Sequence, residues 1–183
     1  MAEIYSDKKV SVVAIGKKGN DVLSKNLEIL SNQSTVFDKL SFENVAEIAE
    51  MLMAKFESGA FDKIELVYNK FKNAATQIVT TEQFLPIVAT ADERGAPSDY
   101  IFEPTKEEIV KTLIPKSLKM QLYKAIRDSF ASEHGVILIA MHKATDNATE
   151  LRDQLKLTYN KARQAAITNE ILEIVGGAEA LNS

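Results

Sequence analysis

Residues 116–183 read KSLKMQLYKAIRDSFASEHGVILIAMHKATDNATELRDQLKLTYNKARQAAITNEILEIVGGAEALNS, and this stretch decides the fold. It contains no proline, and its only glycines are Gly135, Gly176 and Gly177. At ~1.5 Å per residue, a helix over residues 116–175 would be about 90 Å long, far longer than a compact domain of this size requires. Charged residues recur every few positions up to Arg163, which excludes a membrane span. The length therefore predicts a coiled coil or a helical repeat.

A stripe of residues at alternating spacings of three and four favours the coiled coil over the helical repeat. We call it the seam, and it comprises Met141, Ala144, Ala148, Leu151, Leu155, Thr158, Ala162, Ala165, Asn169 and Leu172. This heptad spacing predicts a left-handed supercoil with a second helix. Four of the ten are alanines, beside which the partner backbone can approach closely. The alternative is an amphipathic helix lying on its own domain, which we disfavour because the remaining chain is too short to cover it.

Composition describes a soluble globular chain without thiol chemistry. Of the 183 residues, 45% are hydrophobic and 26% are charged, with a net charge of −4. There is no cysteine, which excludes disulfides, thiol nucleophiles and cysteine-ligated metals. No apolar run is long enough for a membrane span, and residues 1–9 carry no signal-peptide pattern. The mild acidity argues against nucleic acid as a partner.

The sequence before residue 116 predicts an α/β domain over residues 1–115. VSVVAIG, residues 10–16, reads as a buried strand of a parallel sheet, followed by a helix over residues 21–30 and a short strand over residues 35–37. Strand, glycine turn and helix begin a βαβ unit. We then expect a helix that Ser41 caps and Gly59 ends. Its apolar face would comprise Val45, Ile48, Ala49, Leu52 and Phe56.

Two neighbouring runs of strand character follow, over residues 61–70 and residues 69–87, and the second is interrupted near residues 73–75. A loop and a short strand over residues 100–102 come next. Thr105 and Glu108 have the spacing of a helix capping box, and we expect that helix to stop at Pro115. The long coiled-coil helix then fills residues 116–183.

No arrangement of residues predicts an active site, a cofactor site or a metal site. GKKG, residues 16–19, resembles a phosphate-binding loop, but no serine or threonine follows the lysines, so we read it as a tight surface turn. His134 and His142 lie eight residues apart and do not converge on one metal. Asp146, Glu150 and Asp153 alternate with basic residues, as on a solvated helix face.

The last twenty residues are poorly suited to water. Arg163 is the final basic residue, and Glu170, Glu173 and Glu179 follow it near the helix C-terminus, where negative charge opposes the helix dipole. Apolar and small residues cover much of the surface between them: Ala165, Ala166, Ile167, Ile171, Leu172, Ile174 and Val175. A frayed tail is one interpretation. The other is a tip that inserts into an apolar socket.

ATDNATELRDQLKLTYNKARQAAITNEILEIVGGAEAL, residues 144–181, closely resembles the C-terminal signature of the gamma subunit of F-type ATP synthases. VVAIGKKG, residues 12–19, and LVYNKFKNAATQ, residues 66–77, are similar to the Rossmann-like domain of the same family. Family members begin with a long N-terminal helix and a first strand–helix unit that this chain does not show. The resemblance implies that this chain is the later part of a gamma subunit and that the N-terminal helix is the coiled-coil partner.

The resemblance also implies a central-stalk rotor for ATP synthesis and hydrogen ion transport. Its partners would be the alpha and beta subunits, the epsilon subunit and the c-ring, at the cytoplasmic face of the bacterial plasma membrane. The chain itself would be non-catalytic and would need no cofactor. By motif position, Arg163, Gln164, Thr168 and Glu170 would face the beta-subunit loops. Ile137 stands where the family usually has an arginine, which removes a polar contact there.

Two rival functions follow from the residues without the resemblance. Composition and periodicity also fit a non-catalytic scaffold or adaptor, in which an α/β domain carries a coiled-coil arm. The GKKG turn also allows a small nucleotide-binding enzyme, which nucleotide titration would test.

Overall fold

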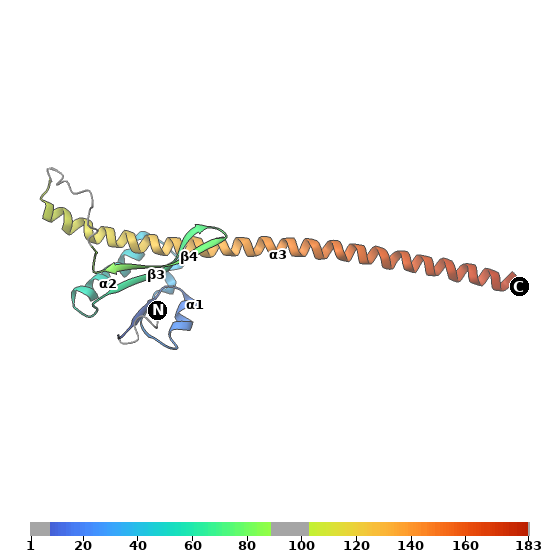
Figure 1. Cartoon of the computed structure of the whole chain (residues 1–183), viewed down its shortest axis with the longest axis horizontal. Coiled ribbons are helices and arrows are strands. Elements are labelled where there is room, and N and C mark those ends of the chain that lie inside the picture. Colours follow the sequence, from blue (N-terminus) through green and yellow to red (C-terminus); the bar gives the residue numbers. More distant parts are fainter. Residues whose placement is uncertain (1–7, 89–102, 183) are drawn as a thin grey trace. The chain divides into compact units, whose positions relative to one another are not determined.

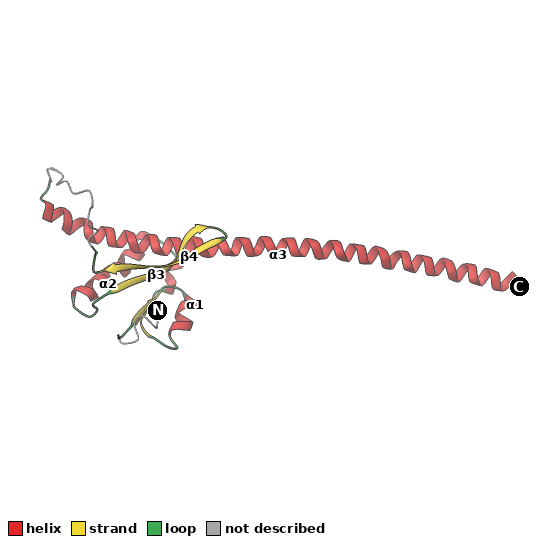
Figure 2. Ribbon diagram, viewed as in Figure 1, coloured by secondary structure: helices red, strands yellow, loops and turns green. Residues whose placement is uncertain are grey.

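The computed structural model describes residues 8–88 and 103–182, with side-chain surroundings described as far as residue 178. The chain is a mixed α/β region followed by a long C-terminal helix, as the sequence predicted (Figures 1 and 2). It divides into two compact units. Unit 1 is Met1–Phe71 with Gln77–Ala131, and unit 2 is Lys72–Thr76 with Ser132–Ser183. The assignment of residues 1–115 and 116–183 to separate domains stays a prediction.

The first strand and its parallel partner form the predicted βαβ unit. β1 (Ser11–Ala14) and β2 (Glu28–Asn32) pair in parallel, with α1 (Lys17–Leu23) between them. The register pairs Ser11 with Glu28 and Ala14 with Asn32, and it shifts by one residue after Val12. The predicted parallel strand is therefore confirmed.

Two local expectations in this region are wrong. The helix predicted over residues 21–30 ends at Leu23, and β2 occupies its second half. Its apolar spacing came from two separate elements, because Leu30 belongs to the strand. The strand expected over residues 35–37 is a 3-10 helix, η1 (Ser34–Phe37). The Asn32 side-chain oxygen accepts a hydrogen bond from the Ser34 N–H at 3.1 Å, which turns the chain out of the extended conformation.

α2 (Phe42–Glu57) forms as predicted, with both of its ends specified by the sequence. The Ser41 hydroxyl accepts a hydrogen bond from the Asn44 N–H at 3.3 Å. Gly59, at φ 72°, follows the last turn in the left-handed conformation that favours glycine. Four of the five residues of the predicted apolar face are buried, and the fifth, Phe56, is partly buried; the four are Val45, Ile48, Ala49 and Leu52.

A second two-stranded sheet consists of β3 (Ile64–Asn73) and β4 (Thr76–Leu85). The predicted pair of neighbouring strands is confirmed. The turn between the strands is fixed by Asn73, whose side-chain oxygen accepts a hydrogen bond from the Ala75 N–H at 3.0 Å. The strand expected over residues 100–102 lies outside the described residues.

α3 (Lys106–Asn182) is a single helix of 77 residues, and Pro115 lies inside it. Thr105 caps its start, because the hydroxyl accepts a hydrogen bond from the Glu108 N–H at 3.4 Å. The predicted helix end at Pro115 is wrong, because α3 continues through this residue. An interior proline costs about 3 kcal/mol. The next turns bury Leu118 and Leu122, each worth about 1.5–3 kcal/mol, which is enough to outweigh that cost.

The core of unit 1 lies between α2, the β3–β4 sheet and the first part of α3 (Figure 1). Its most buried residues are Val36, Val45, Ile48, Ala49, Leu52, Leu66, Phe84, Leu85, Leu118, Leu122, Ala125 and Ile126. The Lys119 ammonium pairs with the Glu50 carboxylate of α2 beside this core. The rings of Phe42 and Tyr123 meet edge to face at 5.7 Å between centroids. The start of α3 is thus part of the α/β core.

Candidate functional site

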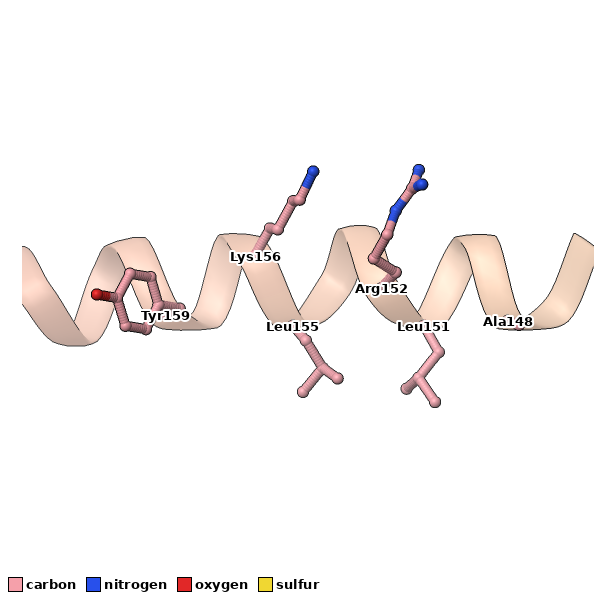
Figure 3. Close-up of a pocket in the computed structure, with 6 residues that line it drawn as sticks. All are labelled: Ala148, Leu151, Arg152, Leu155, Lys156 and Tyr159. Carbon is pink, nitrogen blue, oxygen red and sulfur yellow. The ribbon is translucent and has the colours of Figure 1, made fainter.

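The seam forms an exposed face of α3 in unit 2. All ten seam residues are exposed: Met141, Ala144, Ala148, Leu151, Leu155, Thr158, Ala162, Ala165, Asn169 and Leu172. Figure 3 shows the middle of this face, where Leu151 and Leu155 point to the same side of the helix. Their exposed fractions are 57% and 60%. Large aliphatic side chains in a regular row, so open to water, are typical of a surface that binds another helix.

A polar face lies on the other side of the same turns. Arg152 and Lys156 point away from Leu151 and Leu155 in Figure 3, and together with Ala148 and Tyr159 these residues line a shallow surface depression. The Arg152 guanidinium pairs with Asp153 at 2.9 Å. On a further face of the same turns, Gln154 Nε2 donates to Glu150 Oε1 at 3.3 Å. These contacts are typical of a solvated helix surface, so the apolar row is the face that needs a partner.

The four residues predicted to face the beta-subunit loops are all exposed, and they occupy two faces of α3. Arg163 and Glu170 lie seven residues apart, on one face and about 10 Å from each other along the axis. Gln164 and Thr168 lie on another face, where the Thr168 hydroxyl donates to the Gln164 carbonyl at 2.8 Å. They do not converge on one point. An elongated contact around the helix suits them better than a pocket.

The last turns of α3 expose aliphatic side chains on several sides, as the sequence predicted. Ile167, Ile171, Leu172, Ile174 and Val175 are between 49% and 72% exposed. Exposed apolar area wider than a single stripe is typical of a helix end that another protein surface covers. A further apolar group precedes the seam and includes Ile137, at 41% exposed.

The GKKG segment forms a tight turn between β1 and α1, and its geometry gives little support for a phosphate site. Gly16 has φ 124°, and its carbonyl accepts a hydrogen bond from the Asn20 N–H at 3.1 Å. The helix it opens, α1, has seven residues. Across residues 8–88 and 103–182, no group of three or more His, Asp or Glu side chains is arranged to hold a metal ion. His142 instead lies 3.9 Å from Asp146 on the same helix.

One exposed apolar surface was not predicted from the sequence. In unit 1, Val110, Leu113 and Met120 of α3 are exposed, at 42%, 55% and 51%. Their spacing of three and seven residues was a signal that could have revealed them, since it matches the seam. The expected break at Pro115 separated them from it.

Comparison with known proteins identifies the family. A family model described as ATP synthase matches residues 1–181. The ATP synthase gamma chain of Flavobacterium psychrophilum is 73% identical over 181 residues, and that of Flavobacterium johnsoniae is 72% identical over 181 residues. The chain belongs to the ATP synthase gamma-chain family. In both pairs the match covers 98% of this chain and 63% of the relative, so the chain spans less than two thirds of these gamma chains.

Solved structures support the same fold. A chain of the Euglena gracilis mitochondrial ATP synthase, from a structure of OSCP, F1 and c-ring, matches with a TM-score of 0.61 and 20% identity, over 98% of this chain and 65% of that chain. A chain of the Tetrahymena thermophila mitochondrial ATP synthase central stalk and c-ring matches with a TM-score of 0.56 and 22% identity, over 76% and 63%. In the parts of this gamma-family chain that the structure describes, no helix is both long enough and apolar enough to cross a bilayer.

Proposed function

We propose that this chain acts as the central-stalk rotor part of an F-type ATP synthase, coupling ion-driven rotation to conformational change at the catalytic sites of the beta subunits. The observation that carries the proposal is α3. A helix of 77 residues, exposed along a heptad-spaced row, belongs to a gamma-family chain. A second helix paired along this row would stiffen α3 for the transmission of torque, and the seam provides the face for that pairing.

The seam residues would be covered by a gamma-chain N-terminal helix. Alanines at Ala144, Ala148, Ala162 and Ala165 allow close approach of the two backbones, while Leu151 and Leu155 supply the apolar area. Burying each leucine contributes about 1.5–3 kcal/mol. The pairing would leave the polar face with Arg152 and Lys156 directed away from the partner helix.

The rotor would select among beta-subunit states by its angle. The paired helices are asymmetric, so each orientation presents different side chains to each beta subunit. A difference in contact energy shifts the population of open and closed beta conformations. Arg163 would supply charge-assisted hydrogen bonds to carboxylates of the beta-subunit loops, with Gln164, Thr168 and Glu170 completing the contact. The apolar tip around Ile171 and Ile174 would sit in an apolar socket of the alpha–beta ring.

This function assigns the remaining partners and the location. The α/β region would contact the epsilon subunit and the c-ring, and the chain would lie at the cytoplasmic face of the bacterial plasma membrane. The nucleotide sites would belong to the alpha–beta ring, so this chain would bind no nucleotide and perform no catalysis itself. Its place as a subunit of the ATP synthase complex is supported by the family match.

A pull-down tests the proposal. The tagged chain is incubated with lysate containing synthase subunits, with and without the N-terminal part of the F. psychrophilum gamma chain that this chain does not match. Mass spectrometry identifies the captured subunits. We expect alpha, beta and epsilon, in greater yield when the N-terminal part is added. Capture of none of them by folded chain would overturn the rotor assignment and favour the scaffold alternative.

A further inference from the structure

Unit 2 joins two segments that lie far apart in the sequence. One is Lys72–Thr76, which includes the turn between β3 and β4, and the other is the part of α3 from Ser132 onward. Figure 1 shows this turn beside α3. The turn therefore joins its own two strands and also packs with the long helix.

Three residues of unit 2 are shielded from water, and they locate the contact between its segments. Ser132 is 1% exposed, and Gly135 and Ala74 are half-buried. The other residues of unit 2 whose surroundings are described, 72–73, 75–76, 133–134 and 136–178, are all exposed. Ser132 and Gly135 lie about one turn apart on one face of α3. Ala74 is the shielded residue of the turn, so it marks the side of the turn that meets this face.

A comparison with two other glycines of α3 shows that Gly135 is covered from outside the helix. Gly176 and Gly177 lie in the same helix and are exposed, and a Cβ added to either would meet nothing within 4 Å. The helix alone therefore does not shield a glycine, and a second segment must shield Gly135. Because glycine has no Cβ, it lets the backbone of such a segment approach closely.

Gly135 is also a weak point of α3. Glycine in a helix interior favours the open state, because its backbone gains the most freedom there. Sharp helix bends occur preferentially where Gly and Ser lie together. The turn that meets this point is itself fixed, since the Asn73 side-chain oxygen accepts a hydrogen bond from the Ala75 N–H at 3.0 Å. A fixed turn on the bend-prone face opposes bending of the helix.

We propose that the turn between β3 and β4 is a brace that holds α3 straight at Ser132 and Gly135. While Ala74 is seated on this face, the helix stays closed around Gly135. When the turn lifts, Gly135 becomes a hinge and the following part of α3 bends on its own. The brace lies within this chain and goes beyond the rotor proposal, to which it adds a point where the long helix changes between a stiff and a flexible state.

Disulfide crosslinking tests the contact. The chain has no cysteine, so two introduced cysteines are its only thiols. Ala74→Cys combined with either Gly135→Cys or Ser132→Cys should form a disulfide within one chain under mild oxidation, since such a bond requires Cα atoms about 4.4–6.8 Å apart. Ala74→Cys with Ile137→Cys, on the opposite face of α3, should not. Mass spectrometry of the digested chain identifies the linked pair. Failure of both expected pairs, or equal linkage to residue 137, would overturn the contact.

Hydrogen exchange of the full chain tests the effect of the contact on the helix. Ala74→Glu places a long charged side chain at the half-buried position, and it should raise amide exchange over residues 133–139 by at least about tenfold. Ala75→Glu, the same change at the neighbouring exposed position, is the matched control and should leave that exchange unchanged. Exchange over residues 150–160 should be the same in both variants. Equal exchange over residues 133–139 in the two variants, or an equal rise along the whole of α3, would overturn the brace.

The outcome is separable from that of the rotor proposal. If the pull-down recovers no synthase subunit but Ala74 crosslinks to α3 and Ala74→Glu frees residues 133–139, the rotor assignment fails and the brace stands. If synthase subunits are recovered and neither crosslink forms, the brace fails alone.

Discussion

The Tyr68 hydroxyl donates a hydrogen bond to Glu82 Oε2 at 2.9 Å and so joins the side chains of β3 and β4. The other oxygen of Glu82 accepts a hydrogen bond from Gln121 Nε2 of α3 at 2.8 Å. One carboxylate thus ties both strands of the sheet to the long helix. Because α3 is anchored to the sheet here as well as through Leu122, the start of the helix is fixed by polar and apolar contacts together.

The first prediction concerns the titration of Tyr68. Burial, and then the hydrogen bond to Glu82 and its charge, raise the pKa of Tyr68 from its ordinary value of 10.0 to about 12. The neutral phenol is favoured in the folded state, so its stabilising effect is complete below pH ~10 and is lost as the pH rises through about 12. An absorbance titration of phenolate formation should show one of the five tyrosines ionising last.

Tyr68→Phe identifies that tyrosine. The substitution should remove the late step and lower the free energy of unfolding by about 1 kcal/mol, the usual net value of one hydrogen bond. Tyr159, which is 67% exposed, provides the control, because Tyr159→Phe should leave the late step of Tyr68 in place. A late step that survives Tyr68→Phe would contradict the assignment.

Leu122 is expected to be among the most important apolar residues for stability. It is 2% exposed and packs in the core of unit 1, so Leu122→Ala should reduce the free energy of unfolding by about 2–5 kcal/mol. Urea denaturation followed by circular dichroism measures this loss. Leu157→Ala, at a position 64% exposed, should change it by less than about 0.5 kcal/mol. Similar effects of the two variants would argue against the helix–sheet core.

Leu151→Asp should disrupt pairing of α3 with a second helix. The side chain is exposed in this chain alone, so the variant should keep its stability, but pairing would bury the new carboxylate in an apolar seam. Binding of a peptide spanning the gamma-chain N-terminal helix should weaken at least about tenfold, as measured by calorimetry. Arg152→Asp, on the polar face, should have little effect. Unchanged binding by Leu151→Asp would refute the register of the seam.

Arg163→Ala with Gln164→Ala should weaken coupling between rotor and ring while leaving the fold intact. Both side chains are exposed, and alanine favours the helix. In a reconstituted complex, we expect less ATP-driven proton pumping per ATP hydrolysed. Helicity by circular dichroism is the control. A large loss of helicity would show that these residues are structural, and full coupling would remove them from the proposed contact with the beta subunits.

An element could be predicted from the sequence where the local signals for its start, its buried face and its end agreed. The cap at Ser41, the apolar face from Val45 to Leu52 and the end at Gly59 agree, and α2 formed within those limits. The long helix was predictable because residues 116–183 contain no proline and only three glycines. The row of Leu151 and Leu155 was predictable in the same way, since helical periodicity determines which residues share a face.

The rest depended on contacts that no local pattern encodes. Leu27 and Leu30 continued a helical spacing, but pairing with β1 drew Leu30 into a strand. Proline chemistry argued for a helix end at Pro115, but the burial of Leu118 and Leu122 outweighs the lost hydrogen bond. The second apolar face, with Leu113 and Met120, could not be separated from the core face before the core was known.

Pro115 also divides α3 into parts that should exchange amide hydrogens at different rates. Proline has no N–H, so the Lys111 carbonyl receives no hydrogen bond from residue 115. The first turns, beginning at Lys106, can therefore open without breaking the hydrogen bonds that follow. The turns from Leu118 onward open only when the core opens. A local opening that stops at Pro115 would let this end of the helix fluctuate on its own while the core keeps its protection.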